Sequence, residues 1–195
     1  MSVKKNKLKD VVFYSSERGN YNELDVETYV TTDNLLQDKS GLKKAVSLPL
    51  NGKTFPKYKP DDILVSNIRP YLKKIWYSNR EGICSSDVLT FSVNKAYLPK
   101  FIYYNLFRDE FFDHMMHGAK GTKMPRGDKK QILEYEIPDF PFDNQLKIAS
   151  ILTSIDEKIK LNNKINDNLF YKIYPTVTWP FISMGKSQSL SFVRC

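Results

Sequence analysis

A long stretch without helix breakers most constrains what this chain can fold into. From Asp143 onward no glycine or proline occurs until Pro175, and apolar residues recur there at spacings of four and three. The same spacing continues into two asparagines and a leucine, so the seam comprises Ile148, Leu152, Ile155, Ile159, Asn162, Asn166 and Leu169. This pattern predicts a long helix with about three heptads.

The seam leaves two interpretations of the helix open. Spacing alone is equally consistent with an amphipathic helix packed on its own domain and with a coiled coil. Asn162 and Asn166 favour pairing with another helix, because a buried Asn in a coiled coil sets register and partner at a cost in stability. We therefore expect the seam to mediate dimerisation.

The chain before the helix has the pattern of an α+β domain. Residues 62–66, 74–77 and 87–93 have the apolar or alternating pattern of strands, which predicts a mixed or antiparallel sheet. Residues 97–107 follow with helical spacing and carry a proline suited to the first turn. Further expectations are helix at 111–116, loop at 118–128 and strand at 133–137.

The length indicates one globular domain with an appended element. A chain of 195 residues can bury a core of ordinary size, whereas two large independent domains would need more. We divide it into a globular domain at 1–142, a long helix at 143–170 and a tail at 171–195. The tail abandons the heptad and contains Pro175 and Pro180.

Charge and cysteine content favour an anionic partner and a reducing compartment. Thirty Lys and Arg against 22 Asp and Glu give a net charge of +8. Cys84 and Cys195 make no disulfide framework, and neither a signal peptide nor an apolar run of about 18 residues is visible. We expect a cytoplasmic protein that does not enter a membrane.

Two basic windows are the candidate DNA-binding surface. The first, Ser66–Arg80, has no acid and interleaves its cations with aromatic residues. The second, Gly118–Lys130, combines Lys and Arg with a glycine-rich backbone and has Asp128 as its one acid. Such segments can approach phosphates and base edges. The candidate DNA-binding residues are Arg69, Lys73, Lys74, Lys120, Lys123, Arg126, Lys129 and Lys130.

Signals of catalysis are weak. Glycine-rich nucleotide motifs and an Asp-Pro-Pro-Tyr methyltransferase motif do not occur. Pro60-Asp61 and Asp156-Glu157-Lys158 match the letters of a metal-dependent nuclease, but such short patterns recur by chance. We interpret His114 and His117 as solvated or packed histidines and Cys84 as a small buried side chain, with no catalytic or metal site.

Four segments, taken together and in order, carry a resemblance to a known family. They are Asp62-Ile63-Leu64-Val65-Ser66-Asn67-Ile68-Arg69-Pro70-Tyr71, Gly82-Ile83-Cys84-Ser85-Ser86-Asp87, Gly121-Thr122-Lys123-Met124-Pro125-Arg126, and Ile137-Pro138 followed by Asn144-Gln145-Leu146-Lys147-Ile148-Ala149-Ser150-Ile151-Leu152. The chain resembles a DNA specificity (S) subunit of a type I restriction-modification system over residues ~8–170.

The resemblance implies an α+β target recognition domain that reads one half of a bipartite site in double-stranded DNA. It also implies a conserved long helix that pairs and docks a methyltransferase subunit. A restriction subunit completes such complexes, in which the partners use S-adenosylmethionine, ATP and Mg²⁺ and this chain needs no cofactor. Only one recognition domain is present, so we expect a homodimer or pairing with another S subunit. The alternatives are a module of a fused nuclease or methyltransferase and a degenerate, assembly-only fragment.

Overall fold

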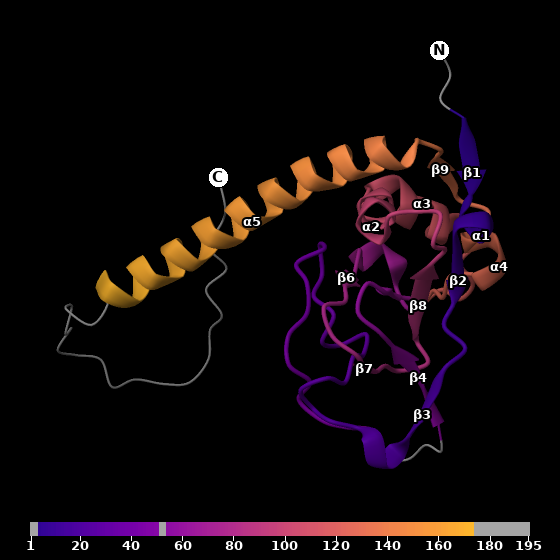
Figure 1. Ribbon diagram of the computed structural model, residues 1–195. Helices are drawn as coiled ribbons and strands as arrows, with labels where there is room; N and C mark the ends of the chain where they lie inside the picture. Colours follow the sequence, from indigo (N-terminus) through magenta and orange to yellow (C-terminus); the bar gives the residue numbers. More distant parts are fainter. Residues whose placement is uncertain (1–3, 51–53, 174–195) are drawn as a thin grey trace. The chain divides into compact units, whose positions relative to one another are not determined.

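The computed structural model describes residues 4–50 and 54–173 of the chain (Figure 1). The chain forms two compact units, Met1–Thr153 and Ser154–Cys195. The first unit combines helices with antiparallel sheets, which confirms the predicted α+β class. None of the helices in the described ranges is long and apolar enough to span a membrane.

A four-stranded sheet lies at the centre of the first unit. In spatial order its strands are β2 (Val12–Tyr14), β8 (Val88–Val93), β5 (Ile63–Ser66) and β6 (Ile75–Tyr77). Each described pair in this sheet is antiparallel, which decides between the two arrangements left open by the sequence. All four residues of β5 are buried, because both faces of this sheet are covered.

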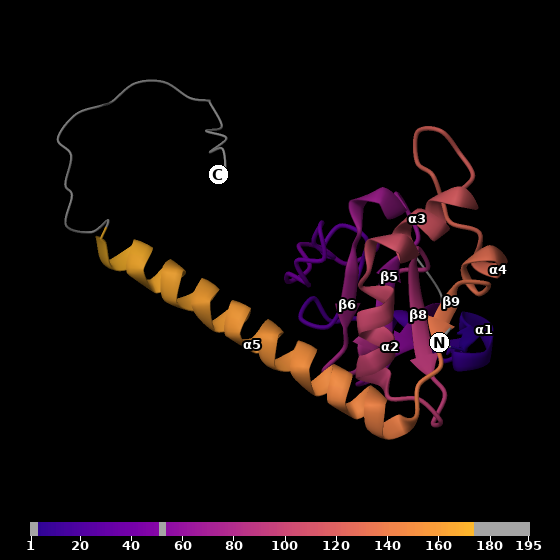
Figure 2. The same cartoon turned by 90° about the horizontal axis from the view of Figure 1, so that it is seen from above.

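Side chains alternate along β5 between two cores. Ile63 and Val65 join the main core, whereas Leu64 lies in a smaller core on the opposite face. The main core is covered by α2 (Pro99–Leu106) and α3 (Asp109–His117), and Figure 2 shows α2 lying across the sheet. The proline at the start of α2 occupies the first turn, as its position predicted.

A three-stranded sheet carries the opposite side of the unit. It consists of β3 (Arg18–Asn20), β4 (Thr54–Tyr58) and β7 (Gly82–Ile83), none of which the sequence pattern predicted as a strand. The short helix η1 (Tyr21–Glu23) follows β3. An isolated parallel bridge joins Val30 to Cys84 beside this sheet. It ties the long irregular segment after η1 to the rest of the fold.

The first and last strands of the unit pair with each other. They are β1 (Lys5–Lys7) and β9 (Glu136–Pro138), with α1 (Leu8–Val11) and α4 (Lys129–Ile132) next to them in sequence. The strand expected at 133–137 is β9, which begins three residues later than predicted, at Glu136. Asp128 caps α4 by accepting hydrogen bonds from the backbone N–H groups of Lys130 and Gln131, and the chain leaves α4 through a turn before β9 begins.

The predicted long helix is α5 (Phe142–Ile173), which passes through both units. Its seam divides into two parts. Ile148 and Leu152 pack against the main core, as in the amphipathic interpretation, whereas Ile155, Ile159 and Leu169 are each about half exposed. Asn162 and Asn166 are exposed as well. The predicted tail lies outside the described residues from 174 onward.

Candidate nucleic-acid interface

Three loops meet beside the N-terminal end of β8. We call Asn67–Arg69, Ser85–Asp87 and Pro125–Gly127 the loop junction. The Arg69 N–H donates to the Pro125 carbonyl at 2.8 Å, and the Gly127 N–H donates to the Asn67 carbonyl at 3.2 Å. The Asn67 N–H donates to the Asp87 carbonyl at 2.9 Å. These bonds bring the two basic windows together, and an isolated bridge between Ile68 and Arg126 extends the contact.

The loop before the junction is closed on itself by paired backbone bonds. Lys120 and Arg126 exchange N–H and carbonyl groups, both at 2.9 Å. Gly121 has a φ of +95°, a conformation that glycine adopts without the steric penalty of a side chain. Lys123 and Met124 lie exposed at the tip between the paired ends. The loop therefore presents a cation and an apolar side chain on a defined backbone.

Arg126 links this loop electrostatically to the next one. Its guanidinium lies 3.1 Å from the Asp87 carboxylate, and more than half of the Arg126 side chain stays exposed. Because the pair lies at the surface, its contribution to stability is small, and one edge of a guanidinium can still donate outward. The pair positions Arg126 more than it stabilises the fold.

Two polar atoms at the junction are enclosed without a hydrogen-bond partner. They are Nε of Arg69 and Oδ1 of Asn67. Arg69 also has a φ of +50°, which a side chain other than glycine adopts at an energetic cost. Unsatisfied polar atoms and strained backbone are both unfavourable, and both concentrate at sites that serve function.

The helical turn η2 (Pro70–Leu72) follows the junction and is itself followed by two cations, Lys73 and Lys74. Burial lowers the pKa of Lys74; the negative charge of Asp33 opposes this effect, and the positive charges of Lys43 and Arg69 add to it. The Lys74 ammonium donates to the Thr32 carbonyl. The two neighbouring cations add positive charge beside Lys74, which an anionic ligand would offset.

Lys73 differs from its neighbours because it is already paired. The Asp109 carboxylate accepts hydrogen bonds from Lys73 at 2.8 Å and from Lys39 at 2.6 Å. These two cations hold the pKa of Asp109 at about 2. Lys73 would have to leave Asp109 to contact a phosphate.

The remaining predicted cations lie at the surface of the second window. Lys120 is 3.7 Å from Asp128, and the Lys129 ammonium lies 5.7 Å from the centre of the Tyr14 ring. Within the described ranges, Lys123 and Lys130 have no carboxylate at ion-pair distance. All the predicted DNA-binding residues thus lie in the first unit, and Arg69, Lys74 and Arg126 are at or directly beside the junction.

The residues considered for catalysis have structural contacts. Cys84 is fully buried, its sulfur lies 3.3 Å from the Thr90 hydroxyl, and burial raises the pKa of its thiol to about 11. This confirms the small buried cysteine. His114 and His117 bond to the carbonyls of Gln131 and Asp113. Across the described residues, no cluster of three His, Cys, Asp or Glu could hold a metal.

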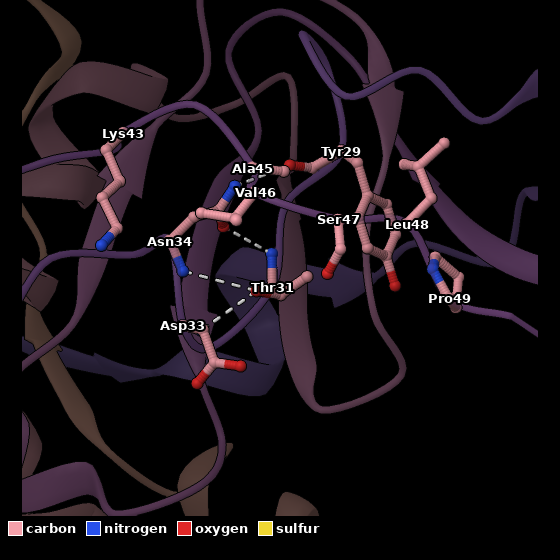
Figure 3. Close-up of a pocket in the computed structure, with 10 residues that line it drawn as sticks. All are labelled: Tyr29, Thr31, Asp33, Asn34, Lys43, Ala45, Val46, Ser47, Leu48 and Pro49. Atoms are coloured by element: carbon pink, nitrogen blue, oxygen red, sulfur yellow. Dashed lines mark hydrogen bonds between the residues drawn. The ribbon is translucent and has the colours of Figure 1, made fainter.

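A hollow of about 290 Å³ lies elsewhere, along the irregular segment after η1 (Figure 3). Hydrogen bonds among Thr31, Asp33 and Asn34 shape one wall, and Tyr29 and Leu48 lie at the other end. The side chains are neutral or of mixed charge, so this hollow lacks the cationic character of the junction.

Sequence reasoning missed two cations that the fold brings to the same region. Lys43 acts electrostatically on Lys74, and Arg18 lies on β3 near Ser86. Both come from the first 60 residues, where turns and mixed charge obscured any periodic pattern. The signal that could have found Lys43 is the pair Lys43-Lys44, a short basic run in a loop.

With this geometry in place, comparison with known proteins decides the family. Residues 2–170 match the model of the type I restriction modification DNA specificity domain. The chain belongs to this family. The specificity family therefore accounts for nearly all of the described chain, including the loop junction and the first 29 residues of α5.

Individual relatives agree with this membership. The HindI type I restriction enzyme specificity subunit of Haemophilus influenzae is 28% identical over 174 residues, which cover 83% of this chain and 37% of that protein. The HsdS subunit from Thermoanaerobacter tengcongensis has a similar fold, with a TM-score of 0.62, 18% identity and coverage of 85% of this chain and 45% of that one. The S subunit from M. genitalium also has a similar fold, with a TM-score of 0.54, 19% identity and coverage of 90% of this chain and 46% of that one. This specificity-family chain spans less than half the length of these relatives.

Proposed function

We propose that this chain is a sequence-specific DNA-recognition subunit of a type I restriction-modification complex and reads one half of a bipartite site. One observation carries the proposal: three of the segments on which the resemblance to the family rests, around Asn67, Asp87 and Arg126, meet at one surface that carries the candidate cations. Base edges in the major groove offer the acceptors that exposed Arg and Lys side chains recognise. The exposed loop from Lys120 to Arg126 has the shape and charge to enter a groove.

In this proposal the chain itself carries out no chemistry and uses no cofactor. Methyl transfer with S-adenosylmethionine belongs to a methyltransferase subunit, and ATP- and Mg²⁺-dependent cleavage belongs to a restriction subunit. The buried, weakly acidic Cys84 thiol and the structural bonds of both histidines support this division. Such complexes act on DNA in the cytoplasm.

Selection of bound duplexes from a randomised pool tests the recognition role. The purified chain, alone and with its methyltransferase partner, should enrich one short half-site, and Arg126→Ala should weaken that enrichment. Lys95→Ala is the matched control, since Lys95 is an exposed cation beyond the opposite end of β8. Binding without any enriched sequence would favour an assembly-only fragment, and cleavage with Mg²⁺ alone would favour a nuclease.

We further propose that two copies pair antiparallel through the second half of α5, or that one copy pairs with another S subunit. Ile155, Ile159 and Leu169 form an apolar stripe on this part of the helix, and each is about half exposed. Burying such a stripe against a second helix removes apolar area from water. The exposed Asn162 and Asn166 on the same seam would then set the register.

Replacing one seam residue separates pairing from general surface effects. Ile159→Asp should convert a dimer to a monomer in sedimentation equilibrium, because it places a charge on the seam. Leu161→Asp should not, since Leu161 is equally exposed but lies roughly 200° around the helix from Ile159. A homodimer would read an interrupted palindrome. A wild-type chain that remains monomeric beside its methyltransferase partner would contradict the homodimer.

A further inference from the structure

A small cationic hollow lies next to the loop junction, on the side of β2 and β3. Its volume is about 150 Å³, and its lining includes Tyr14, Arg18, Ser86, Thr90 and Lys129. Ser86 belongs to the junction, and Lys129 follows Gly127 by two residues. The hollow is therefore continuous with the junction.

The two cations of the hollow differ from three of the cations around them, which are ion-paired. Lys73 is paired with Asp109, Lys120 with Asp128 and Arg126 with Asp87. Among the described residues, neither Arg18 nor Lys129 has a carboxylate at ion-pair distance. Two unneutralised cations at one hollow create a site that attracts an anion.

The acid closest in sequence to Lys129 does not cancel this charge. The Asp128 carboxylate accepts hydrogen bonds from the Lys130 and Gln131 backbone N–H groups and interacts with Lys120. These contacts lower the pKa of Asp128 and occupy its oxygens. Burial raises the pKa of Tyr14 and the Asp128 charge still adds to that effect, but the described lining of the hollow holds two cations and no carboxylate.

The fold holds the backbone of both cations in place before any ligand arrives. The Tyr14 hydroxyl donates to the Lys129 carbonyl at 2.9 Å, and the Tyr14 ring packs 5.1 Å from the Phe91 ring. The Lys129 ammonium lies over the same Tyr14 ring, 5.7 Å from its centre. Arg18 starts β3, whose backbone is paired with Pro56 on β4. A site organised in advance loses less entropy on binding.

We propose that this hollow binds one backbone phosphate of the DNA duplex whose bases the loop junction reads. The inference rests on the proposed DNA-recognition function and deepens it. A guanidinium matches phosphate oxygens with two parallel N–H donors, an ammonium adds a point charge, and the Ser86 hydroxyl can donate a third kind of hydrogen bond. Phosphate contacts fix the register of a protein on DNA without carrying sequence information. In this proposal Arg18 and Lys129 contact the phosphate and fix the register of the protein on DNA, whereas Arg126 contacts a base edge.

Salt dependence of binding tests the hollow directly. Fluorescence anisotropy of the selected duplex with the full chain, with its methyltransferase partner present, is measured over a series of salt concentrations for wild type, Arg18→Ala, Lys129→Ala and the double variant. Each lost phosphate contact should make the slope of log K against log salt less negative by up to about 0.9. Affinity should fall equally for the selected and an unrelated duplex, because no base contact is lost.

The control is Lys95→Ala, whose cation lies past the far end of β8, a six-residue strand roughly 20 Å long. Urea unfolding confirms that each variant folds. Arg18→Lys should recover part of the slope, since it keeps the charge. If the hollow variants retain the wild-type slope, or change it no more than Lys95→Ala, the phosphate assignment is wrong while DNA recognition stands. A wild-type complex that binds no duplex overturns both proposals.

A second arm separates a DNA phosphate from free phosphate. Neutral methylphosphonate groups are placed one at a time along the selected duplex. At one position the substitution should lower the affinity of the wild-type protein for the duplex but should not lower that of the double variant any further. That position identifies the contacted phosphate. A parallel titration with inorganic phosphate follows the Ser86 amide resonance. Saturation by inorganic phosphate, with no methylphosphonate position coupled to the variants, would overturn the DNA assignment.

Discussion

Arg126 shows how a single side chain can be both restrained and available. Asp87 holds its guanidinium at 3.1 Å, while its own backbone is bonded to Lys120 and that of the next residue, Gly127, to Asn67. In the proposed role, a guanidinium held in this way loses little conformational freedom when it meets a base edge. Lys123, by contrast, lies exposed on the tip of the same loop and has no such restraint among the described residues.

Arg126 and Lys123 should therefore respond differently to truncation. We expect Arg126→Ala to cost about 1–3 kcal/mol at one base position and to relax specificity there. Lys123→Ala should weaken binding to every sequence and reduce the salt slope. Competition binding against all single-base variants of the half-site measures both. If both variants lose the same affinity at every base position, Arg126 has no role in reading a base.

Asp109 provides a pH test at the same scale. Its pKa of about 2, set by Lys39 and Lys73, lies below the ordinary Asp value of about 3.9. The depressed pKa means that the contribution of the carboxylate to stability is present above about pH 4 and is lost as pH falls towards 2. In urea unfolding, the stability difference between wild type and Asp109→Asn should shrink over this window. A difference that is constant from pH 6 to pH 2 would contradict the pairing.

Strands and helices with a periodic pattern of apolar residues were predictable from the sequence. Short elements that form by pairing with distant segments were not. The runs at 62–66, 74–77 and 87–93 became β5, β6 and β8, and the proline-led helix became α2. The strands β3 and β7 have three and two residues, too few for an alternating pattern to appear. The short helix α4 was missed because its signal is a cap, Asp128, within a loop-like sequence.

Gly82 illustrates a constraint that lies between elements. A Cβ at this position would lie 2.8 Å from the Thr28 carbonyl oxygen and 2.5 Å from the Tyr58 hydroxyl oxygen, which itself donates to Thr28. Gly82→Ala must therefore displace backbone, and we expect a loss of about 1–3 kcal/mol in the free energy of unfolding. Gly118→Ala should cost less, because the three atoms nearest to its Cβ all belong to the Gln131 side chain and none to the backbone. Urea unfolding compares the two, and equal costs would argue against the backbone contact.

At the scale of the whole molecule, the basic windows were predictable but their meeting was not. Composition and spacing identified cations in two loops, whereas the bridge between Ile68 and Arg126 joins segments far apart in sequence and has no local signal. Arg18 was missed for the same reason, since it lies beside Ser86 only in the folded chain. The division of the helix seam depends on where the core ends, after Leu152, which heptad spacing alone does not encode.

The proposed division of labour makes a prediction for the assembled complex. Lys158→Ala should leave methylation and cleavage by the complex nearly unchanged, because Lys158 is exposed on α5 and belongs to no metal-binding cluster among the described residues. Incubation of the purified chain with DNA and Mg²⁺ measures intrinsic cutting. A metal-dependent cut that disappears in both Asp61→Ala and Lys158→Ala would establish a nuclease instead.

The pairing of β1 with β9 has a consequence for how the protein is made. Lys7 faces Glu136, so the partner of the first strand leaves the ribosome only after about 130 further residues have been added. At a translation rate of about 5–20 residues per second, β1 waits roughly 6–26 s. The apolar strands β5 and β8 are synthesised during this interval, before the later residues Ile132, Ile137 and Ala149 that complete the main core. Chaperones that shield apolar segments during translation should therefore raise the yield of this chain more than its modest size suggests.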